Sequence, residues 1–142
     1  MQLPAHLESL VVKTGLHLGV LCDADRALVL ALAACAIEPG RSLREHEVNR
    51  RLVDWLADLG QMLSTDHVEL RRWLVDAGFI VRDDWGHAYA RRAAELERTR
   101  QVLGTADRSA LASAVRAARV AAQAARLARR QAFASRRSRT PA

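Results

Sequence analysis

The chain has 142 residues, of which half are hydrophobic and six are aromatic, so we expect one small domain with an appendage and a largely aliphatic core. Its formal net charge of +6 is unevenly spread, because residues 1–90 hold nine basic and thirteen acidic side chains, whereas residues 91–142 hold thirteen arginines and three acidic side chains. Two cysteines are too few for a disulfide framework, no signal peptide is apparent, and the longest apolar run is about half of what a bilayer crossing needs. These totals argue against secreted disulfide-rich and integral membrane proteins, and we expect a cytoplasmic protein with reduced thiols.

The first predicted elements are a short N-terminal segment and a buried helix. Residues 1–20 form the N-terminal segment, which predicts at most a short helix because two glycines interrupt it. The helix that follows begins near Asp23 or Asp25, either of which can cap it, and is stopped by a Pro-Gly pair at 39–40. Since this run is apolar on nearly every side, we expect it in the middle of a domain, with Cys35 as a small core residue.

Two further helices follow, each with clear start and stop signals. Ser42 and Glu45 fit a capping box, an apolar stripe follows at three- and four-residue spacing, and Gly60 ends the helix. The next helix begins at Asp66 or the preceding threonine and ends at Gly78.

A β-hairpin is predicted after the third helix, since β-forming residues flank the turn sequence Asp-Asp-Trp-Gly at 83–86. The order of helix, helix, helix and hairpin is that of a winged helix-turn-helix, in which the third helix faces the major groove and the hairpin forms the wing. We therefore predict a mainly α fold with a small β-hairpin, namely a winged helix-turn-helix-like domain over residues 21–92.

Residues 93–142 form a basic helical tail, rich in alanine and arginine, which we expect to dock weakly and to fray in its last eight residues. A basic tail on a slightly acidic body suits a polyanion such as nucleic acid, and it is equally compatible with a solubilising role. Five of its arginines share one side of the helix and are candidate phosphate contacts: Arg116, Arg119, Arg126, Arg130 and Arg137.

The pattern Glu45-x-Glu47-Val48-Asn49, followed by Asp66-x-x-x-Leu70-Arg71-Arg72-x-Leu74-Val75-Asp76-x-Gly78, resembles a bacterial family known as domain of unknown function 2087. The family's trailing arginine, glycine, tyrosine and arginine are met by Arg82, Gly86, Tyr89 and Arg91, and the likeness spans roughly residues 24–92. The resemblance implies a small winged-helix-type domain, and some members of the family are joined to ArsR-type or other helix-turn-helix regulators. It provides no catalytic residues.

Two adjacent arginines, Arg71 and Arg72, lie in the middle of the predicted third helix, where arginine can contact guanine edges or phosphates. The same helix carries three acidic residues, a balance that suits phosphate poorly. In the alternative, structural interpretation, Arg72 pairs with Asp76 one turn on and Arg71 pairs with Asp54 or Glu47 of the second helix. We favour structural pairing for at least one of the two.

The predicted wing supplies the remaining candidates. Arg82, His87, Arg91 and Arg92 can contact the DNA backbone or minor groove. Trp85 at the turn can stack on a base or on a partner protein, but we expect it to fold back on the third helix.

The sequence thus supports a hypothesis of an accessory DNA-binding or transcription-regulating protein that contacts double-stranded DNA, with affinity from the tail and orientation from the third helix and wing. The alternative is a protein-interaction module of winged-helix shape that engages a partner or a second copy without nucleic acid. We expect no enzyme, cofactor, metal site or membrane contact. The five histidines are dispersed, and the sequence has no glycine-rich phosphate loop, nucleophile elbow or Cys-x-x-Cys pair.

Overall fold

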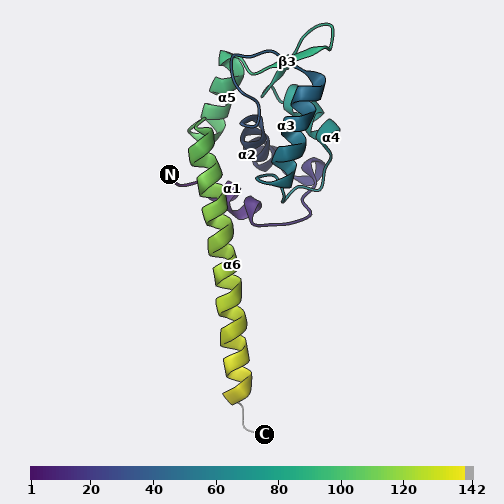
Figure 1. The fold of residues 1–142 in the computed structure, drawn as a ribbon. Helices are drawn as coiled ribbons and strands as arrows, with labels where there is room; N and C mark the ends of the chain where they lie inside the picture. Colours follow the sequence, from purple (N-terminus) through teal and green to yellow (C-terminus); the bar gives the residue numbers. More distant parts are fainter. Residues whose placement is uncertain (140–142) are drawn as a thin grey trace.

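The structure is a computed structural model that describes residues 1–139. It is mainly helical, with a small three-stranded antiparallel sheet and a long C-terminal helix (Figure 1). The elements in chain order are α1 (Ala5–Val11), a 3-10 turn η1 (Leu18–Val20), α2 (Asp23–Ala34), β1 (Leu43–Arg44), α3 (Glu45–Ala57), α4 (His67–Asp76), β2 (Val81–Arg82), β3 (Ala88–Ala90), α5 (Ala93–Leu103) and α6 (Arg108–Arg139).

Helix α2 lies at the centre of the body, as its apolar sequence predicts. Every residue from 29 to 37 is buried, including Cys35, and the helix contacts α1, α4 and α5. The prediction that Asp23 or Asp25 caps α2 is wrong: the N-cap is Cys22, whose sulfur accepts a hydrogen bond from the Asp25 backbone N–H at 3.5 Å. Because both aspartates lie in the first turn, they still complement the positive end of the helix dipole.

The start of α3 differs from the prediction in an informative way. Ser42 and Glu45 do not form a capping box, because Leu43 and Arg44 are extended as strand β1 and the helix begins only at Glu45. The Glu47 carboxylate instead accepts a hydrogen bond from the backbone N–H of Arg44 at 3.2 Å, so the N-cap lies two residues later than predicted. The two-residue strand is what displaces the cap.

Helix α4 and the hairpin follow their local signals. The Asp66 side chain accepts a hydrogen bond from the Glu69 backbone N–H at 2.8 Å, and Gly78 adopts a φ of +79° just beyond the helix end. Strands β2 and β3 pair across the predicted turn, and β1 adds to the other edge of β3, giving the order β1-β3-β2. The addition of β1 fastens the start of α3 to the hairpin.

The N-terminal segment belongs to the same core as the rest of the body. The side chains of Leu7 and Leu18 are fully buried, and α1 packs against both α2 and α6. Helix α1 therefore links the centre of the body to the C-terminal helix.

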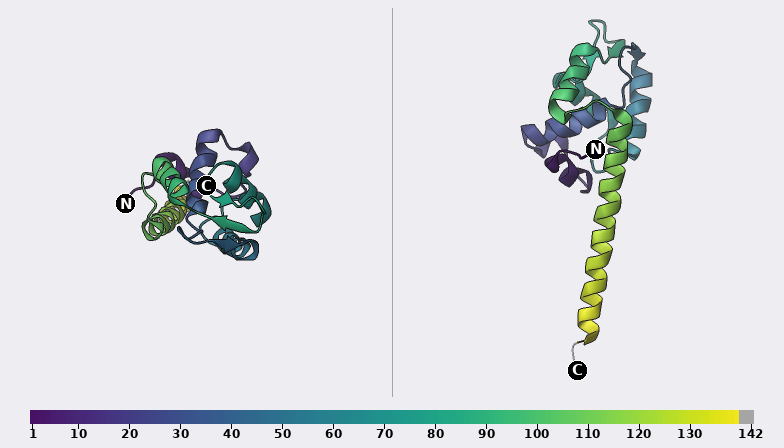
Figure 2. Two further views of the ribbon diagram at one scale, coloured as in Figure 1. Left: turned by 90° about the horizontal axis from the view of Figure 1, so that it is seen from above. Right: turned by 90° about the vertical axis from the view of Figure 1, so that its left-hand side faces the viewer.

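Helix α6 begins against the body and then projects well beyond it (Figures 1 and 2). Leu111 and Val115 are buried, whereas every side chain from 123 to 139 is exposed. At 32 residues, the helix is about 48 Å long. The fraying expected for the last eight residues is not seen at 135–139, which are helical, and 140–142 lie outside the described residues. Within residues 1–139, each helix is too short or too polar to span a lipid bilayer.

Candidate nucleic-acid interface

Arg71, in the middle of α4, is held by neighbouring side chains within the body. Its guanidinium pairs with the Glu45 carboxylate at 2.9 Å and donates to the Asn49 side-chain oxygen. It also lies 5.5 Å from the centre of the Tyr89 ring. Pairing across to α3 is therefore correct as a prediction, although the partner is Glu45 rather than Asp54 or Glu47. Arg71 serves to join α4, α3 and β3.

Arg72 is the exposed guanidinium of α4, and within residues 1–139 it makes no ion pair with Asp76. The predicted pair one turn apart is therefore wrong. Two exposed carboxylates, Glu69 and Asp76, lie on the same helix. The exposed charge of α4 is consequently negative, which disfavours close approach of this helix to phosphates.

The hairpin turn is built by a carboxylate and a glycine. The Asp83 side chain accepts a hydrogen bond from the His87 backbone N–H at 2.8 Å, and Gly86 has a φ of +73°. Trp85 is 81% exposed, so the expectation that it folds back on α4 is wrong. The tip of the hairpin therefore presents an indole to its surroundings.

Three of the four hairpin cations proposed as contacts are exposed: Arg82, His87 and Arg92. The guanidinium of Arg82 lies against Gly86, where a side chain would collide with it. The acidic Asp83 and Asp84 sit beside them in the turn. The hairpin is thus a mixed-charge surface rather than a basic one.

Arg91 is the fourth, and it is removed from the candidate contacts because it is 2% exposed. Its guanidinium donates to the Thr99 hydroxyl at 3.1 Å, to the Ile37 carbonyl at 3.4 Å and to the Cys35 sulfur at 3.8 Å. Burial lowers the pKa of Arg91 and raises the pKa of the Cys35 thiol, which the nearby guanidinium partly offsets. Arg91 ties the end of β3 to α5 and to the end of α2.

Three of the five tail arginines fasten α6 to the body. Arg116 pairs with Asp58 at 2.8 Å, and Arg126 donates to the Val12 carbonyl at 3.1 Å. Arg119 donates to three backbone carbonyls, those of Val11 at 3.0 Å, Asp58 at 3.0 Å and Leu59 at 2.6 Å. Burial lowers the pKa of Arg119. These three side chains cover the ends of α1 and α3.

The remaining predicted tail contacts, Arg130 and Arg137, lie on the projecting part of α6 and are exposed. Helix α6 contains no acidic residue along its whole length. The projecting residues 127–139, which we call the basic arm, carry five arginines and extend about 20 Å. The five are Arg129, Arg130, Arg136, Arg137 and Arg139. The sequence prediction included only Arg130 and Arg137, because it grouped arginines that share one side of the helix.

The predicted contacts fall into two separate groups. The hairpin lies at one end of the molecule, and the basic arm leaves from the opposite end in both side views (Figures 1 and 2). The fold therefore does not bring the wing residues and the arm residues together. Any ligand that contacts both groups must reach from the hairpin end of the body to the opposite end.

The part of the chain that the structure describes contains no group of three His, Cys, Asp or Glu side chains placed to hold a metal ion. Residues 23–91 match a family described as "Uncharacterized protein conserved in bacteria (DUF2087)". Neither the curated proteins nor the solved structures gave a match. The matched region, just under half of the chain, runs from the first residue of α2 to the end of the hairpin, so this portion of the chain is similar to the bacterial DUF2087 family.

Proposed function

We propose that this protein is an accessory DNA-binding protein involved in transcription, and that the basic arm provides most of its affinity. One observation supports this more than any other: the basic arm projects from the body, and the helix that carries it contains no acidic residue. A cluster of this kind is attracted to a polyanion, and release of condensed counterions drives the binding.

The distribution of the arginines around the arm suits a duplex. At about 100° per residue, the five arginines cover roughly half of the helix circumference, whereas Leu127 and Gln131 lie on the other half. A helix of about 10–12 Å diameter fits the major groove, which is about 12 Å wide. Guanidinium groups on the two flanks of such a helix can reach the phosphates of both strands.

The order of elements from α2 to β3 is that of a winged helix-turn-helix, with β1 inserted before α3. In that arrangement α4 and the hairpin would face a groove of the DNA. The exposed side chains available there are Arg72, Arg82, His87 and Arg92. Because the surroundings of these side chains are acidic, their contribution is to orientation rather than to affinity.

The experiment compares the full chain with a charge-neutralised arm. The variant replaces the five arm arginines by glutamine, which keeps helix propensity: R129Q, R130Q, R136Q, R137Q and R139Q. With a 30-base-pair duplex, the logarithm of the association constant of the full chain is expected to fall by about 4 to 5 units per tenfold rise in salt. The neutralised variant should bind at least about a hundredfold more weakly at low salt, with a much shallower slope.

Equal binding by the two proteins would show that the arm is not the contact. Absence of binding by the full chain at low salt would reject the DNA proposal altogether. Circular dichroism of both proteins provides the control, since the helix content should be the same.

A protein-interaction module is the second candidate, and the exposure of Trp85 favours it. Trp85 is 81% exposed at the tip of the hairpin, and tryptophan is enriched where interfaces concentrate their binding energy. A dimer in sedimentation experiments that dissociates on Trp85→Ala, together with no affinity for DNA, would favour this second function.

A further inference from the structure

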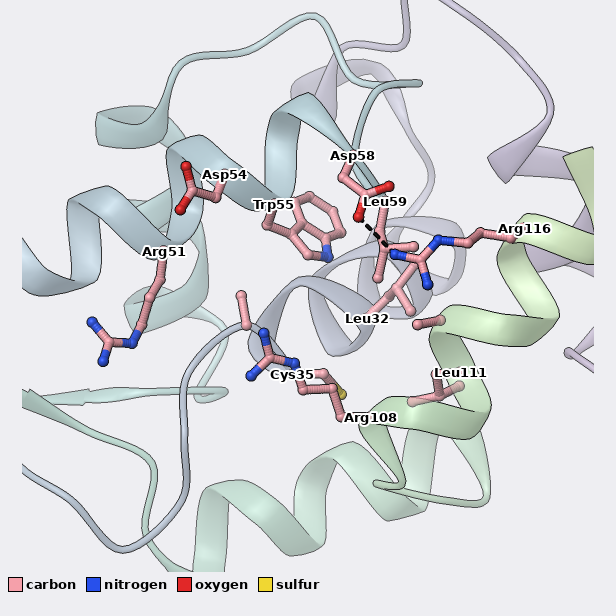
Figure 3. Close-up of a pocket in the computed structure, with 12 residues that line it drawn as sticks. Leu32, Cys35, Arg51, Asp54, Trp55, Asp58, Leu59, Arg108, Leu111 and Arg116 are labelled. Carbon is pink, nitrogen blue, oxygen red and sulfur yellow. Dashed lines mark hydrogen bonds and ion pairs between the residues drawn. The ribbon is translucent and has the colours of Figure 1, made fainter.

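A cavity of about 200 Å³ lies where α2 and α3 meet the first turns of α6 (Figure 3). Its lining combines aliphatic side chains with groups that donate hydrogen bonds or carry charge. The aliphatic wall consists of Leu32, Ala36, Leu59, Leu111 and Ala112.

A buried donor without an acceptor points into this cavity. Trp55, on α3, is 5% exposed, and its indole N–H finds no hydrogen-bond acceptor among residues 1–139. Buried indole N–H groups normally have an acceptor, so an orphaned one calls for explanation. In Figure 3, the nitrogen of Trp55 faces the space between α3 and α6, toward Arg116 and Leu111. An acceptor placed in the cavity would satisfy it.

A guanidinium without an ion pair lies on another side of the cavity. Arg108, the first residue of α6, makes no ion pair with residues 1–139, and in Figure 3 its side chain runs beside Cys35. The other two lining guanidiniums already have partners: Arg51 pairs with Glu38 at 3.1 Å and Arg116 with Asp58 at 2.8 Å. Arg108 is therefore the cation that remains available to a ligand.

Two charged side chains of the lining, Arg108 and Asp54, have no ion pair among residues 1–139. Asp58 is paired with Arg116, and Asp54 lies on the far side of Trp55 from Arg116 in Figure 3. Indole and guanidinium groups donate hydrogen bonds and accept none, so the complementary ligand must supply acceptors.

We propose that this cavity binds a small organic carboxylate with an apolar body. The carboxylate accepts from the Trp55 indole and from Arg108, and the apolar body packs on the aliphatic wall. A cavity of about 150 Å³ is enough for benzene, so the present one suits one ring, or a short branched chain, with a single carboxylate. Since Trp55 belongs to α3 and Arg108 to α6, the ligand would join the DUF2087-like region to the helix that carries the basic arm. The proposal does not depend on DNA binding.

The test uses sodium benzoate as the probe and the full chain as the protein. The three tryptophans give three indole N–H signals in a proton–nitrogen NMR spectrum, and sequential assignment identifies that of Trp55. Benzoate should shift the Trp55 signal saturably, with half-saturation at or below about 1 mM, while the signal of the distant Trp85 stays in place. Benzamide, which keeps the ring and loses the charge, should bind at least about tenfold more weakly.

Two arginine variants make the assignment specific. Arg108→Gln should weaken benzoate binding about tenfold or more and leave that of benzamide unchanged, because the substitution removes the charge of an exposed side chain. Arg129→Gln, on the same helix but away from the cavity, is the matched control and should bind benzoate as the unaltered protein does.

The proposal is overturned if neither benzoate nor 3-methylbutanoate shifts the Trp55 signal at about 10 mM. It is also overturned if inorganic phosphate or chloride produces the same shift at the same concentration, because the apolar wall would then play no part. Equal affinity of Arg108→Gln and the unaltered protein for benzoate would remove Arg108 from the site and with it the proposed recognition.

Discussion

The guanidinium of Arg91 lies in the core, and its acceptors among residues 1–139 are a hydroxyl, a carbonyl and a sulfur rather than a carboxylate. A buried cation of this kind is held by hydrogen bonds alone, and its desolvation opposes them. Its position directly after β3 fixes where α5 begins, since the Thr99 hydroxyl that it contacts lies on α5. The role of Arg91 is to close the body between β3, α2 and α5.

Replacement of Arg91 separates its packing from its charge. Arg91→Met should lower the free energy of unfolding by about 1–2 kcal/mol, because loss of the buried charge offsets part of the lost hydrogen bonding. Arg91→Ala should cost about 3–4 kcal/mol, because it also leaves a cavity. Urea denaturation measures both values. DNA affinity of the methionine variant should match that of the unaltered protein, and a tenfold loss in a folded variant would contradict a purely structural role.

Arg91 also shows that the burial of a single residue cannot always be predicted from the sequence. Its spacing in the hairpin placed it beside Arg92 as a surface contact, yet Arg92 is exposed and Arg91 is buried. Arg91 directly follows β3 and Arg92 is the N-cap of α5, and only the packing of α5 against α2 decides which of the two is enclosed. No local pattern contains that information.

At the scale of elements, the docking of α6 depends on arginines as much as on apolar side chains. The apolar face of α6 beyond Val115 consists of alanines, which bury little area per turn. Arg119 compensates by donating to the carbonyls of Val11, Asp58 and Leu59, which lie at the ends of α1 and α3. Carbonyls at helix ends lack partners within their helix, so a guanidinium satisfies several of them at once.

Arg119→Gln is therefore expected to lower the free energy of unfolding by about 2–4 kcal/mol, because it leaves half-buried carbonyls without a donor. Amide hydrogen exchange in residues 108–126 should accelerate at the same time. Arg130→Gln is the matched control on the same helix, since its side chain is exposed, and it should change stability by less than about 0.5 kcal/mol. Similar exchange rates in the two variants would show that Arg119 does not hold the helix.

The elements that sequence predicted well are those with local signals. Helix α4 begins at the Asp66 cap and ends before Gly78, and the hairpin turns at Gly86, because each signal acts on backbone groups within a few residues. Strand β1 was missed because two residues carry no pattern, and their pairing depends on Tyr89, which lies more than forty residues away. The contact residues were mispredicted for the same reason. Helical spacing grouped Arg119 with Arg130, although only Arg119 packs against the body.

At the scale of the whole molecule, α6 is divided into a part that completes the core and a part that leaves it. Leu111 and Val115 are buried at 1% and 0% exposure, so the first turns of α6 belong to the body. The basic arm, residues 127–139, makes no contribution to the buried core. The two parts can therefore be removed separately.

A chain ending at residue 126 should fold with a free energy of unfolding within about 1 kcal/mol of the full chain, because it keeps the docked part of α6. A chain ending at residue 106 should be less stable by more than about 4 kcal/mol, or fail to fold, because it lacks the buried side chains of Leu111 and Val115 and uncovers α1. Denaturation midpoints and circular dichroism distinguish the two. Equal stability of both truncated chains would contradict the division of α6.

The contact between α1 and α6 joins segments that the ribosome adds at widely separated times. Arg126 meets the carbonyl of Val12, 114 positions earlier in the chain. At about 5–20 residues per second, the ribosome adds the later partner roughly 6–23 s after the earlier one. During that interval the apolar side of α1 that packs on α6 stays exposed. A nascent chain interrupted before α6 would therefore expose a hydrophobic surface to chaperones and proteases.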